Sequence, residues 1–467
     1  MVFSSLLFMF IYLPVVLAVY YISPLKWRNL WLFIVNLVFY GWGEPVYIAL
    51  MLFSISINYI NAIMIDKYRD TNQRKARNFL TFNTVINLAL LAFFKYFDLF
   101  AATINQIVGT EIVAPLGLAL PIGISFYTFQ TMSYPIDLYR GDTRVQKNFI
   151  SFGTYVALFP QLIAGPIVRY RDVAEQLDYR VHSADKFSSG VRRFTIGLAK
   201  KVLIANNIGV LWDTYSAMPT TELTVVGSWI GIIAFTFQIY FDFSGYSDMA
   251  IGLGRMLGFE FLENFNYPYI SKTVTEFWRR WHISLGTWFR DYVYIPLGGN
   301  RRGKYRQLLN IAIVWALTGL WHGANWTFML WGMYYALFLI IEKLWLLKAL
   351  DRAPNFIGHI YTMIVAICGW VLFQLDSLAE VSSYYKSMFG FAEGGFFTST
   401  DAYYLEAFAV MLIVCVIAST PLLKNLFNRL PEKVRSVAAP VLVVAGLLIP
   451  TAYLVDSSYN PFLYFRF

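Results

Sequence analysis

Long apolar stretches recur along the whole chain and are separated by short polar segments. Several of them approach the roughly 20 residues that an α-helix needs to cross the hydrocarbon core of a bilayer. In chain order, the clearest stretches are residues 4–21, 47–65, 203–211, 225–241, 326–341, 365–373, 407–417 and 441–453. The pattern predicts an all-α polytopic membrane protein, for which the bilayer is the main solvent.

Two segments are not typical of simple spans. Basic residues flank residues 151–168 on both sides, and Pro160, Gly165 and Pro166 interrupt this stretch. Residues 264–306 are too polar to face lipid and too aromatic for a free loop. Because irregular backbone at membrane depth must be buried in protein or line a wet cavity, we expect both segments to be re-entrant and to form a central funnel. On this count the chain has about 11–13 transmembrane helices.

The composition supports this class and limits the chemistry. The hydrophobic share is 58% and the charged share 14%, against roughly 45–50% and about 25% in soluble domains. No internal repeat divides the chain, so we expect one membrane domain over residues 1–467, with a catalytic core at about 115–345 and C-terminal helices and a tail at about 355–467. Cys368 and Cys415 lie in apolar stretches, and we expect neither a metal site nor a bound cofactor.

The positive charge is spread between the apolar stretches. The net charge is +9, yet Lys and Arg occur in short segments rather than on one basic face, which is typical of the positive-inside rule and not of nucleic-acid binding. The basic segments at residues 26–28, 67–77 and 424–435 are therefore expected on the cytoplasmic side. This places both termini outside the cytoplasm and predicts contact with the lipid bilayer and not with nucleic acid.

Two of the four histidines occur in dense aromatic and polar surroundings. His322 lies in Leu-Thr-Gly-Leu-Trp-His-Gly-Ala-Asn-Trp, residues 317–326, between two apolar stretches. An ionisable residue at that depth is a functional hypothesis by default, and imidazole, with an ordinary pKa of about 6.5, can take a proton from a hydroxyl group and return it. We predict that His322 is a catalytic base; the alternative is a buried histidine that bridges two helices.

His282 follows a basic and aromatic segment, Thr-Glu-Phe-Trp-Arg-Arg-Trp, at residues 275–281. Cations near it are suited to the phosphates of an anionic donor, since guanidinium groups make paired bonds to phosphate oxygens. The candidate donor-binding residues are Lys272, Arg279, Arg280 and Arg290. The alternative is an amphipathic helix at the lipid headgroups, anchored by Trp278, Trp281 and Trp288.

Two carboxylates, Asp242 and Asp248, interrupt a long apolar stretch. At membrane depth such groups are paired or face a cavity. They would either orient a catalytic histidine or pair with Arg279 or Arg280 and hold helices together, and we favour the second, structural role.

The segments around His282 and His322 resemble the two histidine regions of the membrane-bound O-acyltransferase family, polytopic enzymes that acylate hydroxyl groups. The similarity is greatest to the branch that includes the membrane subunit of bacterial alginate O-acetylation. It is nearly continuous from Met1 to about Glu342 and weaker beyond. It includes Met-Val-Phe-Ser-Ser at 1–5, Leu-Pro-Ile-Gly-Ile-Ser-Phe-Tyr-Thr-Phe-Gln at 120–130, Leu-Phe-Pro-Gln-Leu-Ile-Ala-Gly-Pro at 158–166, and residues 240–252 and 264–301.

The resemblance implies that His322 corresponds to the invariant histidine of the family, the expected base, and His282 to the second, more variable position. It also implies a cytoplasmic acyl donor, acetyl-coenzyme A, and delivery of acetyl to the outer face of a bacterial inner membrane, for O-acetylation of a polysaccharide such as alginate. A separate extracytoplasmic SGNH-type acetyltransferase, or a similar acceptor protein, would finish the modification. We expect Asn325 and nearby backbone amides to be oxyanion donors.

The C-terminal sequence Asn-Pro-Phe-Leu-Tyr-Phe-Arg-Phe, residues 460–467, suggests a separate hypothesis. Its Phe-x-Tyr-x-x-Phe ending resembles the C-terminal motif of the small partner in teichoic-acid D-alanylation. The phenol of Tyr464 would then lose its proton to His322 and carry acetyl as an aryl ester. The alternative is that these aromatic residues only anchor the tail at the outer interface.

Two other functions remain open. Transfer of D-alanine to teichoic acid is the second candidate within the acyltransferase class, although a Tyr464 motif on this chain's own C-terminus favours acetyl. A membrane transporter would also use re-entrant backbone and membrane-depth carboxylates. It is disfavoured because no inverted repeat is visible and the polar groups gather around histidine.

Overall fold

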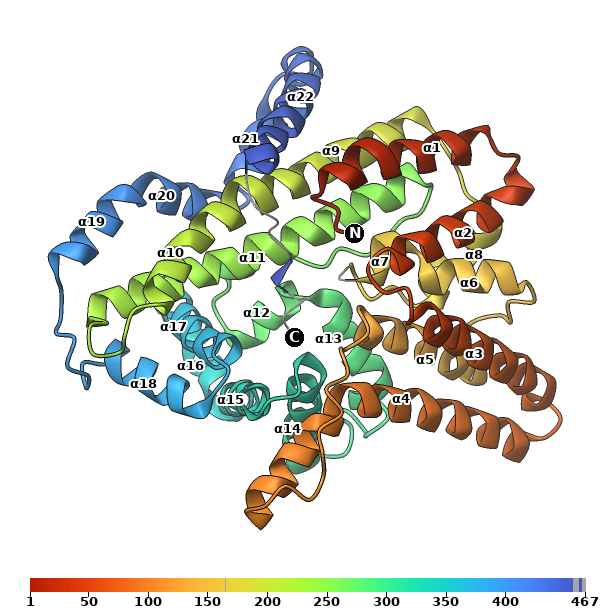
Figure 1. The fold of residues 1–467 in the computed structure, drawn as a ribbon, viewed down its shortest axis with the longest axis horizontal. Helices are drawn as coiled ribbons and strands as arrows, with labels where there is room; N and C mark the ends of the chain where they lie inside the picture. Colours follow the sequence, from red (N-terminus) through yellow and green to blue (C-terminus); the bar gives the residue numbers. More distant parts are fainter. Residues whose placement is uncertain (164, 457–461, 464–467) are drawn as a thin grey trace. The chain divides into compact units, whose positions relative to one another are not determined.

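The computed structural model describes residues 1–163, 165–456, 462 and 463, and within them it contains helices and no strand (Figure 1). This confirms the all-α prediction. The chain divides into two compact units: Met1–Phe194 with Tyr246–Leu262, and Thr195–Gly245 with Glu263–Phe467. Two long helices, α9 (Ala184–Ala199) and α11 (Val225–Met256), contribute residues to both units. A single domain over residues 1–467 stays a prediction.

The first unit contains the N-terminal helices. In chain order these are η1 (Phe8–Tyr12), α1 (Leu13–Ile22), η2 (Leu25–Trp27), α2 (Arg28–Gly41), α3 (Ile48–Arg69), α4 (Gln73–Val108), α5 (Ile124–Arg140), α6 (Phe149–Ala157), α7 (Phe159–Leu162) and α8 (Tyr170–Asp178). Buried asparagines join α3 to α4, because Asn83 Nδ2 donates to Asn58 Oδ1 at 2.9 Å and Asn58 Nδ2 donates to Asn87 Oδ1 at 3.1 Å. Such interhelical amide bonds are typical of helices packed in lipid.

The predicted interruption near Pro160 is confirmed. Helix α6 ends at Ala157, and α7 begins at Phe159 with Pro160 in its first turn. Protein groups satisfy the broken backbone: Phe159 N–H donates to Asn36 Oδ1 at 3.1 Å, and Gln161 Nε2 donates to Tyr155 O at 2.6 Å. Buried irregular backbone needs such partners.

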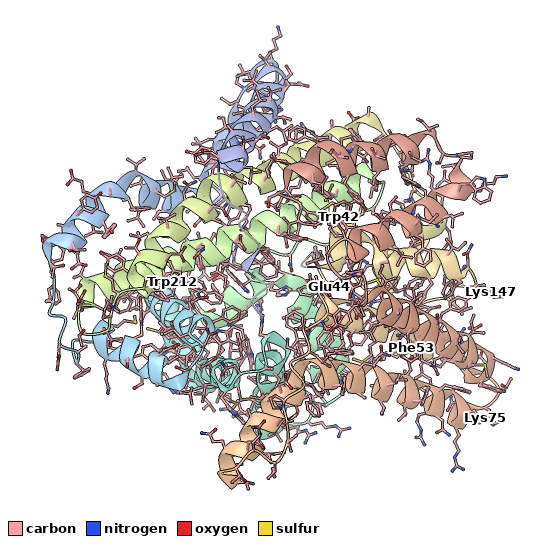
Figure 2. The ribbon with its side chains drawn as sticks, viewed as in Figure 1. Trp42, Glu44, Phe53, Lys75, Lys147 and Trp212 are labelled. Carbon is pink, nitrogen blue, oxygen red and sulfur yellow. The ribbon has the colours of Figure 1, made fainter. Side chains whose placement is uncertain are left out.

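The second unit contains the C-terminal helices. In chain order these are η3 (Lys200–Ala205), α10 (Asn206–Ser216), η4 (Pro268–Ile270), α12 (Val274–Arg280), α13 (Ile283–Phe289), η5 (Arg290–Tyr294), α14 (Lys304–His322), α15 (Trp326–Ile341), η6 (Glu342–Leu346), α16 (Leu347–Leu350), α17 (Asn355–Gln374), α18 (Leu378–Met388), α19 (Ser399–Ala407), α20 (Ala409–Ala418), α21 (Leu422–Arg429) and α22 (Glu432–Asp456). Trp212 packs into this unit, 5.3 Å from the Phe235 ring, whereas Lys75 and Lys147 of the first unit point outward (Figure 2).

In the described part of the chain, seven helical stretches are long and apolar enough to cross a membrane, or eight if the bent pair α19 and α20 forms one span. The seven are Ile48–Arg69, Gln73–Val108, Ala184–Ser216, Val225–Met256, Trp326–Leu350, Asn355–Gln374 and Glu432–Asp456. The expected 11–13 is larger because it also counted shorter apolar stretches, such as Phe8–Ile22, as spans. The chain is a multi-pass membrane protein.

Candidate functional site

A tight helical hairpin, formed by α14 and α15, fixes the position of His322. His322 is the last residue of α14, and the extended backbone of Gly323 ends the helix. The two helices approach at glycines: a Cβ added to Gly319 would collide with the carbonyl oxygen of Phe328, and one added to Gly332 with that of Trp315. The backbones of two helices can approach this closely only where the residues at the contact have very small side chains or none.

We therefore expect Gly332→Ala to destabilise the protein by about 1–3 kcal/mol, because the new methyl group meets backbone that must move. Thermal unfolding of the purified protein in nanodiscs would measure the change. Gly286→Ala is the matched control, since the nearest atom to its added Cβ lies 3.9 Å away. Equal unfolding temperatures for wild type and Gly332→Ala would contradict this account of the hairpin.

Aromatic rings enclose the His322 imidazole. His322 is only 4% exposed, and its ring lies 4.9 Å from the Trp331 ring, 5.0 Å from Trp321 and 5.3 Å from Phe373, all near edge-to-face. Trp331 belongs to α15 and Phe373 to α17, so three helices hold one imidazole. Walls of this kind keep water from a basic group and limit unproductive hydrolysis.

His282 lies in the same aromatic cluster. Its ring is 6.0 Å from Trp321 and 4.8 Å from Phe243. Its Nδ1 lies 3.1 Å from Asn264 Oδ1, which also accepts from Ser284 N–H at 3.2 Å and Ser284 Oγ at 2.9 Å. As that amide oxygen is an acceptor, Nδ1 carries the proton and Nε2 is the basic nitrogen.

Two further features mark His282 as a constrained residue. Its φ of +46° is rare for a residue other than glycine, and such strain often occurs at functional sites. In the sequence it lies outside the helices that can span a membrane, and burial lowers its pKa. The imidazole is therefore held neutral and in one orientation.

Asp242 pairs with a cation that was not predicted. One carboxylate oxygen contacts Lys201 Nζ, and the other accepts from the backbone N–H of Leu463 at 2.9 Å. Phe462, 2% exposed, lies 5.7 Å from Phe243, the residue that contacts His282. Asp242 therefore joins a buried ion pair to the chain segment just before Tyr464, which itself lies outside the described residues.

The predicted pairing of Asp242 and Asp248 with Arg279 or Arg280 is wrong. Asp248 pairs with Arg193 in the first unit, at 2.7 Å to a terminal nitrogen, and Arg280 pairs with Glu276 at 2.9 Å. The physical reason is that α11 packs against the long helix formed by α9 and η3. Each carboxylate lies opposite a cation of that helix, Asp242 opposite Lys201 and Asp248 opposite Arg193. The structural role that we favoured stays a prediction.

The family model of membrane-bound O-acyltransferases matches residues 140–379, slightly more than half of the chain, and spans both histidines. The chain belongs to this family. The protein is therefore an O-acyltransferase, as predicted from the segments around His282 and His322.

Three relatives illustrate where this acyltransferase lies within the family. It is 43% identical to the probable alginate O-acetylase AlgI of Azotobacter vinelandii, over 84% of this chain and 79% of that protein. It is 33% identical to the peptidoglycan O-acetyltransferase of Helicobacter pylori, over 84% of this chain and 80% of that protein. The teichoic acid D-alanyltransferase of Bacillus subtilis is 31% identical over 48% of this chain and 59% of its own length, and is thus more distant.

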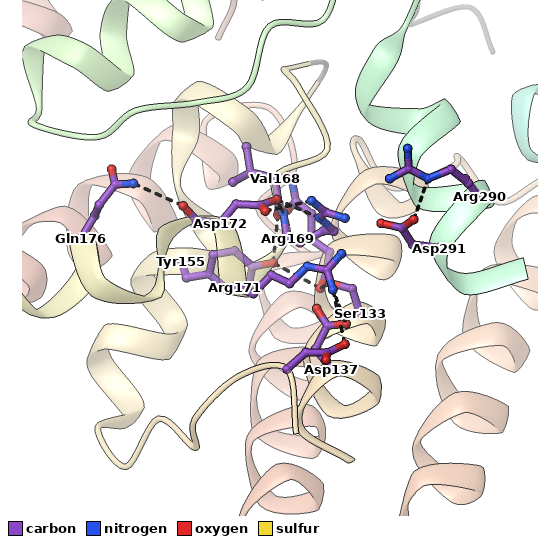
Figure 3. A network of polar contacts seen from close by, with 12 residues as sticks. Ser133, Asp137, Tyr155, Val168, Arg169, Arg171, Asp172, Gln176, Arg290 and Asp291 are labelled. Carbon is purple, nitrogen blue, oxygen red and sulfur yellow. Dashed lines mark hydrogen bonds and ion pairs between the residues drawn. The ribbon is translucent and has the colours of Figure 1, made fainter. Parts of the chain in front are cut away.

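The four predicted donor-binding cations of the acyltransferase lie on the segment from η4 to η5. Arg290 bonds Asp291 at 2.8 Å (Figure 3), and Arg280 bonds Glu276 as well as the carbonyl oxygen of Asn266. Lys272 and Arg279 are exposed, and their side chains form no ion pair recorded among the described residues. Donor binding by these four cations stays a prediction.

Asn325 begins helix α15 of the acyltransferase. Its Oδ1 accepts from Thr327 N–H at 3.2 Å, and its Nδ2 donates to the carbonyl oxygen of Asp376. Because Nδ2 carries two hydrogens, an oxyanion role would use the N–H that does not bond Asp376. That role stays a prediction.

The sequence interpretation missed Glu342, a buried carboxylate at the other end of the α15 segment. Glu342 is 1% exposed and accepts from the backbone N–H groups of Val274 and Thr275, at 2.6 and 2.8 Å, and from Thr275 Oγ1 at 2.6 Å. A carboxylate at a helix N-terminus is favourable because the exposed N–H groups and the helix dipole attract it. It fixes the start of α12, the helix that leads to His282. The sequence does contain a signal for this residue, because Glu342 directly follows the apolar stretch at residues 326–341.

A second polar network, also missed, closes the interrupted segment of the first unit (Figure 3). Arg169 pairs with Asp172 at 2.9 Å, and Arg171 contacts Asp137, a fully buried carboxylate on α5, at 3.4 Å. Tyr155 Oη donates to the carbonyl oxygen of Val168 at 3.0 Å. The bonds of Arg171 and Tyr155 hold the chain after the break at α7 against α5 and α6.

Proposed function

We propose that this acyltransferase takes acetyl from acetyl-coenzyme A at the cytoplasmic face and passes it across a bacterial inner membrane, for O-acetylation of an extracellular polysaccharide such as alginate. The observation that carries the proposal is the aromatic cluster in which His282 and His322 both contact Trp321. The relatives named O-acetylase and O-acetyltransferase, each aligned over 84% of this chain, favour acetyl as the group. Both termini would lie outside the cytoplasm.

In the proposed reaction, His322 takes the proton of an acceptor hydroxyl while the hydroxyl oxygen attacks the carbonyl carbon of the thioester. A C–O bond forms, the C–S bond breaks, and the thiolate of coenzyme A receives the proton from the imidazolium. Backbone amides of the turn after His322, with Asn325, would stabilise the oxyanion. The hydrogen bond from His282 Nδ1 to Asn264 directs the basic Nε2 of His282 away from that amide, where it can position the donor or the acceptor.

The donor's phosphates would bind Lys272, Arg279, Arg280 and Arg290 at the cytoplasmic side. Of these, Lys272 and Arg279 are exposed and need to give up no ion pair, so they would make the first contacts with phosphate. A separate SGNH-type transferase, or a similar acceptor protein, would take the acetyl group at the outer side.

Tyr464 is the proposed intermediate carrier. Two contacts of the segment just before it support this: Leu463 N–H donates to Asp242, and the Phe462 ring contacts Phe243, which in turn contacts His282. The acetyl group would pass from the thioester to the phenol oxygen and leave as a reactive aryl ester.

The test is transfer of radiolabelled acetyl from coenzyme A by the purified protein in nanodiscs, with and without the SGNH-type transferase and a polysaccharide acceptor. We expect label on the polysaccharide only when all components are present, whereas a single turnover on the chain itself already releases free coenzyme A. A covalently labelled chain that is lost in Tyr464→Phe would support the relay, whereas unchanged transfer by Tyr464→Phe would reject it.

The same preparation separates the alternatives. Transfer from a D-alanyl thioester carrier, with none from acetyl-coenzyme A, would replace acetylation by D-alanylation. Solute flux in liposomes without turnover of any thioester would contradict the enzyme and favour a transporter.

A further inference from the structure

A cluster of basic side chains lies in the first unit, at the end of α1, and contains none of the residues of the proposed reaction. Its members are Arg28, Arg180, His182 and Lys186, and we call it the basic cluster. Both guanidinium groups lie over one aromatic ring: the Cζ atoms of Arg28 and Arg180 are 4.9 and 5.8 Å from the centre of the Tyr20 ring. Arg28 also lies 3.3 Å from His182 Nε2.

The basic cluster has an excess of positive charge. Lys186 pairs with Glu260 at 3.3 Å, but neither Arg28 nor Arg180 forms an ion pair recorded within the described residues. Arg180 instead bonds neutral groups, Asn29 Oδ1 at 2.7 Å and the carbonyl oxygen of Gln176 at 3.3 Å. Burial, and then the charges of Arg28 and Arg180, lower the pKa of His182. Like charges in a partly buried site repel each other, so a bound anion would stabilise this arrangement.

The tyrosines that carry the cluster are fixed in place. Tyr20 Oη donates to the carbonyl oxygen of Leu257 at 2.8 Å, and Tyr21 Oη to that of Met256 at 2.6 Å. A cavity of about 490 Å³ adjoins them, lined by Tyr21, His182, Ser183, Ala184 and Phe187. It opens at the start of α9, where Ser183 Oγ accepts from Lys186 N–H at 3.1 Å. The cavity therefore has mostly apolar walls, and His182 in its lining joins it to Arg28 of the basic cluster.

We propose that the basic cluster binds the phosphate of an anionic phospholipid headgroup. Apolar and aromatic side chains at the same end of α1 are exposed, as at a membrane interface: Tyr21, Ile22, Leu25 and Trp27. Guanidinium groups bond phosphate oxygens in pairs, and basic pockets beside transmembrane helices are suited to lipid headgroups. The acyl chains would lie along the apolar side of α1 and the phosphate between Arg28 and Arg180.

The experiment compares the wild type with Arg28→Gln/Arg180→Gln in nanodiscs made from equal amounts of phosphatidylcholine and phosphatidylglycerol. Native mass spectrometry would count the phosphatidylglycerol retained per chain. We expect the double variant to bind it about 30-fold more weakly, since each cation near a membrane surface contributes about fivefold. The control is Arg74→Gln/Arg77→Gln, which removes two exposed cations at the start of α4 and is expected to retain the lipid.

Two further measurements keep the result decisive. Arg28→Lys/Arg180→Lys preserves the charge and is expected to retain part of the binding, which separates loss of charge from misfolding. Addition of inorganic phosphate to protein in pure phosphatidylcholine is expected to leave the unfolding temperature unchanged. Stabilisation of the wild type by phosphate that is lost in Arg28→Gln/Arg180→Gln would assign the cluster to a soluble phosphate and overturn the lipid proposal. Equal retention of phosphatidylglycerol by wild type and Arg28→Gln/Arg180→Gln would overturn it as well.

Discussion

Replacing His322 by alanine is expected to lower acetyl transfer from acetyl-coenzyme A about 10²–10⁴-fold, the usual contribution of a general base. The imidazole lies at the end of α14, held by Trp321, Trp331 and Phe373. The measurement is single-turnover release of free coenzyme A by the protein in nanodiscs. A single-turnover experiment reports the chemical step and is not limited by product release.

Two controls separate chemistry from folding. His322→Gln keeps a polar side chain of similar size and should lose as much activity as His322→Ala, while unfolding close to the wild-type temperature. His359→Gln changes a histidine of α17 whose Nδ1 lies 3.3 Å from the carbonyl oxygen of Ser271, and it should keep most of the activity. If His322→Gln retained more than about a tenth of the wild-type rate, His322 would not be the base.

The sequence was sufficient for features that depend on neighbouring residues. Apolar stretches of about 20 residues predicted the helices that can span a membrane. Pro160 predicted the interruption between α6 and α7. The position of His322 follows from local signals too, because Gly323 ends one helix and Asn325 caps the next.

The sequence was not sufficient where two distant segments had to be placed in register. Asp242 meets Lys201 because α11 packs closely against the neighbouring long helix: an added Cβ at Gly245 would lie 2.8 Å from the carbonyl oxygen of Gly197. A helical pattern gives the face on which a carboxylate lies, but not which residue of another helix it meets. By charge alone, Arg280 was as good a partner for Asp242 as Lys201. However, Glu276 lies four residues before Arg280 on α12, and this spacing could have predicted that the two residues pair with each other.

The number of spans shows a different limit. Apolar stretches of 10–17 residues, such as Phe8–Ile22, can cross a membrane at an angle with help from neighbours, or lie within the bundle. Composition does not separate these cases, because tertiary packing decides between them. The same holds for the segment from η4 to η5, in which two tryptophans are buried in protein rather than exposed to lipid: Trp281 is 4% exposed and Trp288 is 3% exposed.

The second large effect concerns the buried ion pair. Lys201→Met is expected to destabilise the protein by about 3–5 kcal/mol, because it leaves the charge of Asp242 within an apolar helix without its cation. Asp242 is 1% exposed and Lys201 is 4% exposed, so water does not reach the carboxylate to solvate it in place of the lost cation. Unfolding of the purified protein, followed by tryptophan fluorescence over a denaturant series, would give the difference in free energy.

The double variant Lys201→Met/Asp242→Asn decides whether charge is the cause. Asparagine keeps an oxygen that can accept from the N–H of Leu463, while removing the isolated charge, so most of the lost stability should return. Lys433→Met, at an exposed cation on α22, controls for the loss of a lysine elsewhere and should change the free energy of unfolding by less than about 0.5 kcal/mol.

A double variant no more stable than Lys201→Met would mean that lost packing, and not an uncompensated carboxylate, causes the effect. Recovery of stability without recovery of acetyl transfer would show instead that the charge on Asp242 is needed at the site, where it holds the segment leading to Tyr464.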